Sequence, residues 1–294
     1  MVLHFLEFAA LALLLAFAGL VGFVRTLLRP RRARLDRALA KLPVEEVTIR
    51  SRSGATLAGW FAAGEGAGGV LLLHGAKSNR LAHVERMRML ADAGYATLAI
   101  DFQAHGESTG DCITLGQREA LDARSALAWM RARMPGERLA VLGVSMGGAA
   151  ALVGDEPIGA DAVIVESVGA DLAAAVSNRL ALTIGAGARA LTPVVLLALR
   201  AAGGIRPQSL RPIDGIGRLR APVLVLAGAD DRKAASEDSR AMFARANPPK
   251  FYWEAPGAGH IDLAYAGGAA YRERLLAFLA SSLRAGADPD AVSR

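Results

Sequence analysis

The sequence predicts an α/β protein built on a mainly parallel, doubly wound sheet. Short apolar runs typical of buried strands alternate with helical segments of about 10 to 20 residues. The chain has 294 residues, of which 53% are hydrophobic and 21% charged, so it has enough apolar material to cover both faces of such a sheet. The motifs with catalytic potential all follow directly after predicted strands, at the sheet edge where ligands bind in this class of fold.

The predicted elements follow one another in regular order. The strands are Val44–Arg50, Ala55–Ala63, Val70–Leu73, Ala96–Ile100, Leu139–Leu142, Ala162–Val165, Val223–Ala227 and Lys250–Glu254. The helices are Asn79–Gly94, Leu115–Met134, one that begins at Met146, Ser236–Asn247 and Gly268–Leu283. Ser53-Gly54 is a turn signal between the first two strands, and Gly94 and Pro135-Gly136 are suited to end the first two helices.

An apolar run at the N-terminus, from Phe5 to Val24, is interrupted only by Glu7. About 20 residues at about 1.5 Å each match the ~30 Å hydrocarbon core of a bilayer. Arginines follow the run from Arg25 onward, and no Lys or Arg precedes it. We therefore predict a transmembrane or signal-anchor helix over 1–28 and a basic linker over 29–43, with the remaining chain in the cytoplasm by the positive-inside rule.

Two alternatives to an anchor stay open. Ala16-Phe17-Ala18 resembles a signal-peptide cleavage site, which would make the protein secreted or periplasmic, although the positive region that normally precedes such a run is missing. The segment would also suit an amphipathic helix on the membrane surface or on the enzyme itself.

The main domain is expected over 44–285, followed by a polar tail over 286–294. Within it, 171–217 departs from the alternation of strands and helices. This segment is apolar and helical, and it is broken at several Pro and Gly positions. We interpret it as a short helical cap above the sheet edge. A second membrane segment is disfavoured because Arg179, Arg189 and Arg200 interrupt every window of that length.

Charge and cysteine content exclude several function classes. The formal net charge is +6, but the densest basic cluster follows the apolar run, and no nucleic-acid-binding motif is present. We expect a membrane partner through the N-terminal helix and no nucleic-acid partner. Cys112 is the only cysteine, so neither an intramolecular disulfide nor a cysteine metal cluster can form.

Gly143-Val144-Ser145-Met146-Gly147 is a G-x-S-x-G motif between a strand and a helix. In this context the serine lies on a sharp, strained turn that lifts its Oγ above the sheet, and small neighbours let strand and helix approach closely. Ser145 is the predicted nucleophile.

An acid and a base should follow such a serine in that order, each after a strand. His260 is the only histidine after Ser145 and is the predicted base. Asp230 and Asp231 both follow the Val223–Ala227 strand, and only one of them can face His260. We favour Asp231 as the acid, with Asp230 as a turn residue whose side chain bonds local backbone N–H groups.

Two backbone N–H groups should stabilise the oxyanion. We assign them to Met146, which follows the nucleophile, and to Ala76, in the loop after the Val70–Leu73 strand. His74 and His105 are expected to brace loops. Asp101 and His105 alone do not make a metal site, and the glycine-rich stretches match no nucleotide motif, so neither a metal nor a cofactor is predicted.

Together these motifs resemble the α/β-hydrolase superfamily, and most of all the membrane-associated group similar to the Bem46 and ABHD13-like serine hydrolases. The resemblance rests on His74-Gly75, Asp101 with His105-Gly106-Glu107-Ser108, the Ser145 motif, Gly228-Ala229-Asp230-Asp231 and Gly257-Ala258-Gly259-His260, and it covers about Val44 to Leu283. It implies an α/β-hydrolase fold, a Ser145, Asp231 and His260 triad with Ala76 and Met146 as oxyanion donors, and ester or thioester hydrolysis without a cofactor. The chain departs from the family pattern at Gln103, where relatives often have Arg, and at Ile261, where they have Asn.

The function we expect is that of a serine hydrolase that cleaves carboxylic esters or thioesters through an acyl-enzyme. A membrane anchor makes lipid-derived esters attractive substrates. The alternatives are a peptidase or acyltransferase with the same triad, and a catalytically silent membrane-anchored scaffold.

Overall fold

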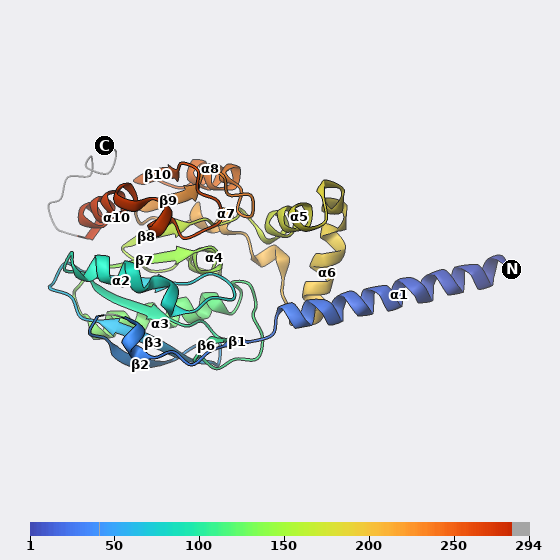
Figure 1. The fold of residues 1–294 in the computed structure, drawn as a ribbon, viewed down its shortest axis with the longest axis horizontal. Helices are drawn as coiled ribbons and strands as arrows, with labels where there is room; N and C mark the ends of the chain where they lie inside the picture. Colours follow the sequence, from blue (N-terminus) through green and yellow to red (C-terminus); the bar gives the residue numbers. More distant parts are fainter. Residues whose placement is uncertain (41, 284–294) are drawn as a thin grey trace.

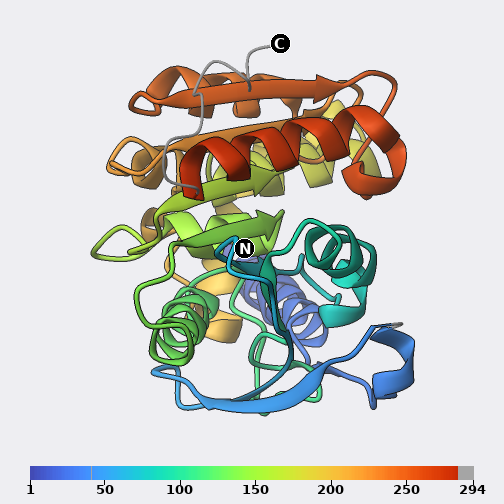
Figure 2. The same cartoon turned by 90° about the vertical axis from the view of Figure 1, so that its left-hand side faces the viewer.

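A computed structural model describes residues 1–40 and 42–283, so the predicted polar tail over 286–294 lies outside the described residues. Its main sheet has the strand order β10-β9-β8-β7-β4-β5-β3-β2. These strands are β2 (Glu45–Arg50), β3 (Thr56–Ala62), β4 (Gly69–Leu73), β5 (Ala96–Ile100), β7 (Leu139–Val144), β8 (Ala162–Glu166), β9 (Val223–Gly228) and β10 (Lys250–Ala255). All neighbours pair in parallel except β2 with β3 and β3 with β5, so the mainly parallel sheet is confirmed. Figure 2 shows the strands stacked from β10 to β2.

The helices largely occupy the predicted segments. They are α1 (Val2–Leu27), α2 (Val84–Ala91), α3 (Glu119–Arg133), α4 (Met146–Leu152), α5 (Leu172–Thr183), α6 (Thr192–Gly203), α7 (Pro212–Ile216), α8 (Ser236–Arg245), α9 (Leu263–Ala266) and α10 (Gly268–Leu283). Two predicted starts were wrong. The helix expected from Asn79 begins as a 3-10 turn, Arg80–His83, capped by the Asn79 side chain. The helix expected from Leu115 begins at Glu119, because the Glu119 carboxylate accepts the N–H groups of Thr114 and Gly116 and holds a turn there.

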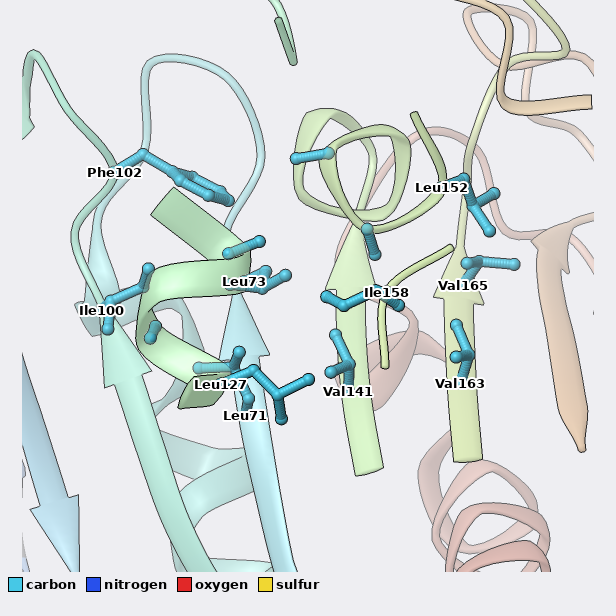
Figure 3. Close-up of a cluster of buried hydrophobic side chains, with 14 of the residues drawn as sticks. Leu71, Leu73, Ile100, Phe102, Leu127, Val141, Leu152, Ile158, Val163 and Val165 are labelled. Atoms are coloured by element: carbon cyan, nitrogen blue, oxygen red, sulfur yellow. The ribbon is translucent and has the colours of Figure 1, made fainter. Parts of the chain in front are cut away.

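Alternate strand residues point to opposite faces of the sheet, and each face has its own core. On one face, Leu71, Val141 and Val163 pack against α3, α4 and α8. Figure 3 shows part of this cluster, with Leu127 of α3 and Leu152 of α4 beside the strand residues. On the other face, Leu72, Leu142 and Ile164 pack against α2 and α10. Burial on both faces explains why these strands are continuous apolar runs in the sequence.

The N-terminal helix projects from the domain, while its C-terminal end is packed against it (Figure 1). Val24 and Leu28 are buried with Ala198 and Leu199 of α6. The next residues form β1 (Arg31–Arg32), which pairs in parallel with β6 (His105–Gly106). The sequence pattern did not predict this ribbon, because two arginines carry no strand signal and their partners lie more than 70 residues away. The α1 helix thus continues directly into hydrogen-bonded structure on the domain.

Candidate active site

Ser145 lies at the sharp turn between β7 and α4, with φ 51° and ψ −114°. A non-glycine residue in this region is strained on the order of 1–3 kcal/mol, so the surrounding structure must impose the conformation. Here the Ser145 N–H donates to the Glu166 carbonyl oxygen at 2.8 Å. A Cβ on Gly147 would lie 2.2 Å from the Leu73 carbonyl oxygen, and one on Gly143 would lie 2.5 Å from the Gly148 Cα. These glycines therefore let α4 pack tightly against β4 and β7 and hold the turn that carries Ser145.

Asp231 and His260 form a hydrogen-bonded pair after β9 and β10. The Nδ1 atom of His260 lies 2.8 Å from Oδ2 of Asp231, whose side chain is fully buried. The other carboxylate oxygen, Oδ1, accepts the N–H groups of Lys233 and Ala234 at 2.8 and 2.9 Å. With an ionised Asp231, the shared proton resides on Nδ1, which leaves Nε2 with the lone pair that a general base needs.

The two adjacent aspartates have different surroundings. Asp230 is exposed, and its N–H donates to the Ala258 carbonyl oxygen at 2.8 Å. Its carboxylate makes no hydrogen bond within the described residues, so the expectation that it bonds local N–H groups was wrong. Asp231 makes those turn bonds itself with Oδ1 while it holds His260 with Oδ2. Asp231 therefore both stabilises its own turn and contacts His260.

Glu166, at the end of β8, holds both the Ser145 turn and the loop that follows His260. The Glu166 carbonyl oxygen accepts the Ser145 N–H, and its Oε1 accepts the N–H of Leu263, three residues after His260, at 3.2 Å. Among the described residues, no hydrogen bond joins Ser145 Oγ to His260 Nε2. Serine–histidine hydrogen bonds are often long in unliganded enzymes and shorten when substrate binds. The structure therefore brings the Asp231 and His260 side chains into contact, while Ser145 lies at the end of β7, two strands away from β9, and its hydroxyl has no hydrogen-bond partner among the described residues.

The side chain of Glu166 belongs to a buried ionic network that sequence reasoning missed. Its carboxylate accepts hydrogen bonds from Arg86 Nη2 at 2.6 Å and from the Tyr271 hydroxyl at 3.0 Å. Arg86 also donates to both carboxylate oxygens of Asp262, in the His260 loop. Burial alone would lower the pKa of Arg86, but the negative charge of Glu166 and its neighbours raises it well above the ordinary value. The network ties α2, β8 and α10 to the loop that carries His260.

The loop that contains Ala76 lies beside the nucleophile. A Cβ on Gly75 would be 3.5 Å from the Ser145 Cβ. The N–H groups of Ala76 and Met146 make no hydrogen bond within the described part of the chain, so both are available to an acceptor. Lys77, which has a positive φ of 62°, donates its N–H to His105 Nε2 at 3.0 Å. That bond holds the turn on which Ala76 lies.

His74 and His105 both brace this loop from within the domain. His74 Nε2 accepts the N–H of Phe102 at 3.0 Å, and its Nδ1 lies 2.7 Å from the Gly75 carbonyl oxygen. Burial, with a smaller contribution from nearby His105, lowers the pKa of His74 to about 3, so its imidazole is neutral. Asp101 forms a buried ion pair with Arg80 and accepts the Glu107 N–H. Asp101 and His105 thus face different partners, and residues 1–40 and 42–283 contain no cluster of three or more metal-ligating side chains.

A cavity of about 660 Å³ separates the cap from the loop of the catalytic-acid candidate. Its cap side includes Asn178, Leu182 and Arg189, and its other side includes Asp231 and Ser236. The cavity therefore lies between the cap and the loop of Asp231, and neither Ser145 nor His260 is among the residues that line it.

Comparison with known proteins agrees with this architecture. The model of the alpha/beta hydrolase family matches residues 70–274. The chain belongs to this family. An uncharacterised protein of Mycobacterium tuberculosis is 27% identical over 84% of this chain and 85% of its own length. The alpha/beta hydrolase domain-containing protein WAV2 of Arabidopsis thaliana is 26% identical over 92% of this chain and 90% of its own.

An esterase of Pyrococcus furiosus has the same fold, with a TM-score of 0.70 and 22% sequence identity. The superposition covers 87% of this α/β hydrolase and 98% of the esterase. The α/β-hydrolase fold expected from the sequence is therefore confirmed. The family match spans β4 to α10, and so includes the Ser145 turn and the Asp231–His260 pair.

Proposed function

We propose that this α/β hydrolase is a serine hydrolase that cleaves carboxylic esters or thioesters through an acyl-enzyme. The observation that carries the proposal is the 2.8 Å contact between His260 Nδ1 and the buried Asp231 carboxylate, in a sheet that also holds Ser145 in a strained turn at the end of β7. An imidazole oriented in this way has its basic nitrogen free to accept a proton.

The proposed reaction proceeds in two balanced halves. Ser145 Oγ attacks the substrate carbonyl carbon while its proton passes to His260 Nε2, and the N–H groups of Ala76 and Met146 stabilise the oxyanion. Collapse of the tetrahedral intermediate breaks the bond to the alcohol or thiol, which leaves with the proton from His260. Water then attacks the acyl-enzyme, gives a proton to His260, and releases the acid as Ser145 recovers its hydrogen.

Membrane anchorage through α1 is part of the proposal. Its 24-residue stretch His4–Leu27 is apolar enough to cross a bilayer, with a mean hydropathy of 2.2. Only 6% of the residues in its apolar 18-residue core are buried inside the protein. Val24 and Leu28 are buried against the domain, which favours a retained anchor over a cleaved signal. The arginines after α1 favour a cytoplasmic hydrolase domain. Retention of the intact chain in membranes after a carbonate wash is expected, and its release would contradict the anchor.

The activity is tested with full-length protein in detergent, using p-nitrophenyl esters of graded chain length and aminoacyl amides. We expect ester hydrolysis, and a loss of about a thousand-fold or more in kcat for Ser145→Ala. Ser281→Ala is the matched control, because Ser281 lies on α10 and, among residues 1–40 and 42–283, donates only to the Phe278 carbonyl oxygen. Undiminished hydrolysis by Ser145→Ala would refute the nucleophile, and cleavage of amides in preference to esters would refute the substrate class.

A further inference from the structure

The cap presents an exposed apolar surface next to the N-terminal helix. This cap face consists of Leu182, Ile184, Leu191, Val194 and Leu197, which are between 38% and 67% exposed. Val194 and Leu197 lie one turn apart on α6 and are exposed, whereas Ala198 and Leu199 of the same helix are buried. In Figure 1, α5 and α6 form the end of the domain from which α1 projects, and α6 runs crosswise to α1. The cap face therefore belongs to helices that lie beside the proposed anchor, since α6 packs against α1.

The free part of α1 is too short to cross a bilayer unaided. Phe17, Leu20 and Val21 pack with the buried cluster that includes α6, which leaves only Val2–Ala16 clear of the domain. Those residues span about 22 Å at about 1.5 Å per residue, whereas the hydrocarbon core is ~30 Å thick. The packed turns of α1 must supply the remaining ~8 Å, so they and the α6 helix beside them must lie within the membrane. This depth agrees with the ~5–10 Å reached by interfacial amphipathic helices.

Because α1 is fixed rigidly to the domain, the depth of α1 in the membrane also sets the depth of the cap. The Leu28 carbonyl oxygen accepts the N–H of Ile113 at 2.9 Å, and the Arg31 N–H donates to the Ala104 carbonyl oxygen at 2.7 Å. A Cβ on Gly203, at the end of α6, would lie 2.7 Å from Leu28 Cδ1. The close packing and the backbone bonds leave no loose linker at which the domain could lift away from the bilayer.

We propose that the cap face is a membrane-binding surface that lies in the lipid leaflet from which α1 emerges. The proposal rests on α1 being the anchor of the proposed function. Arg179, Arg189 and Arg200 are exposed on the same helical segment, where they can contact anionic lipid headgroups while Val194 and Leu197 contact acyl chains. Leu182 belongs both to the cap face and to the wall of the cavity beside Asp231. The cavity therefore borders the cap face, and the proposal extends to the substrate class: ester lipids that enter from the leaflet.

Depth-dependent fluorescence quenching tests the surface directly. Three full-length variants carry Cys112→Ser together with one new cysteine each: Leu197→Cys, Leu13→Cys or Glu156→Cys. The new cysteine is labelled with an environment-sensitive fluorophore. The protein is then reconstituted into phosphatidylcholine vesicles that contain lipids with a quencher at defined depths. We expect shallow quenchers to act at Leu197, deep quenchers at Leu13 on α1, and neither at Glu156, an exposed residue between α4 and β8.

The outcomes separate the cap proposal from the anchor and from the activity. Quenching at Leu13 without quenching at Leu197 would overturn the cap proposal and leave the anchor standing, whereas quenching at neither would contradict the anchor as well. Cross-linking between copies through the cysteine at Leu197, without quenching, would assign the face to a second copy of the chain and also overturn the proposal.

A pair of charge substitutions tests the consequence for substrate access. Val194→Glu with Leu197→Glu should lower hydrolysis of a monoacylglycerol embedded in phosphatidylcholine vesicles at least ten-fold. Hydrolysis of p-nitrophenyl acetate in solution should stay within two-fold, because neither residue touches Ser145, Asp231 or His260. Equal losses on both substrates would refute entry from the leaflet, and absence of hydrolysis in the unsubstituted protein would instead refute the proposed function.

Discussion

Replacement of Glu166 by Gln tests whether the buried ionic network positions the catalytic base. The carboxylate accepts from Arg86, Tyr271 and the Leu263 N–H, all in the interior. Removing one partner of a buried ion pair costs about 3–5 kcal/mol, because the other charge is left without compensation. Arg86 keeps its bonds to Asp262, whose side chain is 46% exposed, so we expect a destabilisation near the lower limit, about 3 kcal/mol.

The exposed ion pair between Glu85 and Arg88 provides the control, because it lies on α2, the helix that carries Arg86. Arg88 lies 3.4 Å from Glu85, with side chains 46% and 69% exposed. Such a pair contributes about 0–1 kcal/mol, so Glu85→Gln should hardly change the free energy of unfolding. Urea unfolding of the full-length protein in detergent, followed by tryptophan fluorescence, measures both variants.

The same substitution should impair hydrolysis by the folded protein. Loss of the Glu166 bond to the Leu263 N–H releases the loop that begins at His260. A hydrogen bond to a charged group contributes about 1.5–3 kcal/mol, which corresponds to a fall of about ten-fold to a hundred-fold in kcat/KM. The role of Glu166 in positioning His260 would be refuted if Glu166→Gln kept full activity and its free energy of unfolding lay within about 1 kcal/mol of that of Glu85→Gln.

Three further predictions concern the site and its supports. Asp231→Asn should reduce kcat/KM by orders of magnitude while Asp230→Asn changes it little, because only Asp231 contacts His260; equal losses in steady-state kinetics would contradict the assignment. His74 has a folded-state pKa of about 3 against about 6.5 when unfolded, so only the unfolded state takes up its proton as pH falls between these values. Stability should therefore decline below pH 6.5, by up to about 5 kcal/mol from this group, and an unchanged pH slope in urea titrations of His74→Gln would contradict this. Gly147→Ala should displace the Ser145 turn and abolish activity because its Cβ would overlap the Leu73 carbonyl oxygen, whereas Gly159→Ala, with open space around it, should be neutral in both esterase and unfolding assays.

The sheet and the contact between Asp231 and His260 were predictable because their signals are local. Each buried strand is a short apolar run, and the predicted and observed bounds of β5 coincide at Ala96 and Ile100. Asp231 and His260 each follow a strand end, and in a parallel sheet neighbouring strand ends lie side by side.

The supporting contacts were not predictable because they join residues distant in the chain. Arg86 and Glu166 are separated by 80 residues, and only the packing of α2 against the sheet brings them together. A charged residue at the end of the apolar β8 run was the one signal that could have drawn attention to Glu166. The error over Asp230 has a similar origin, since side-chain direction at a turn depends on the backbone conformation of the loop rather than on residue type.

The most direct test of the proposed chemistry is to map the residue that a fluorophosphonate modifies. This reagent requires a serine activated by a neighbouring base. We expect one adduct per chain, found on the peptide that contains Ser145, and loss of labelling in His260→Ala. An adduct on another residue, or no adduct on a folded chain, would contradict the assignment of Ser145 as nucleophile.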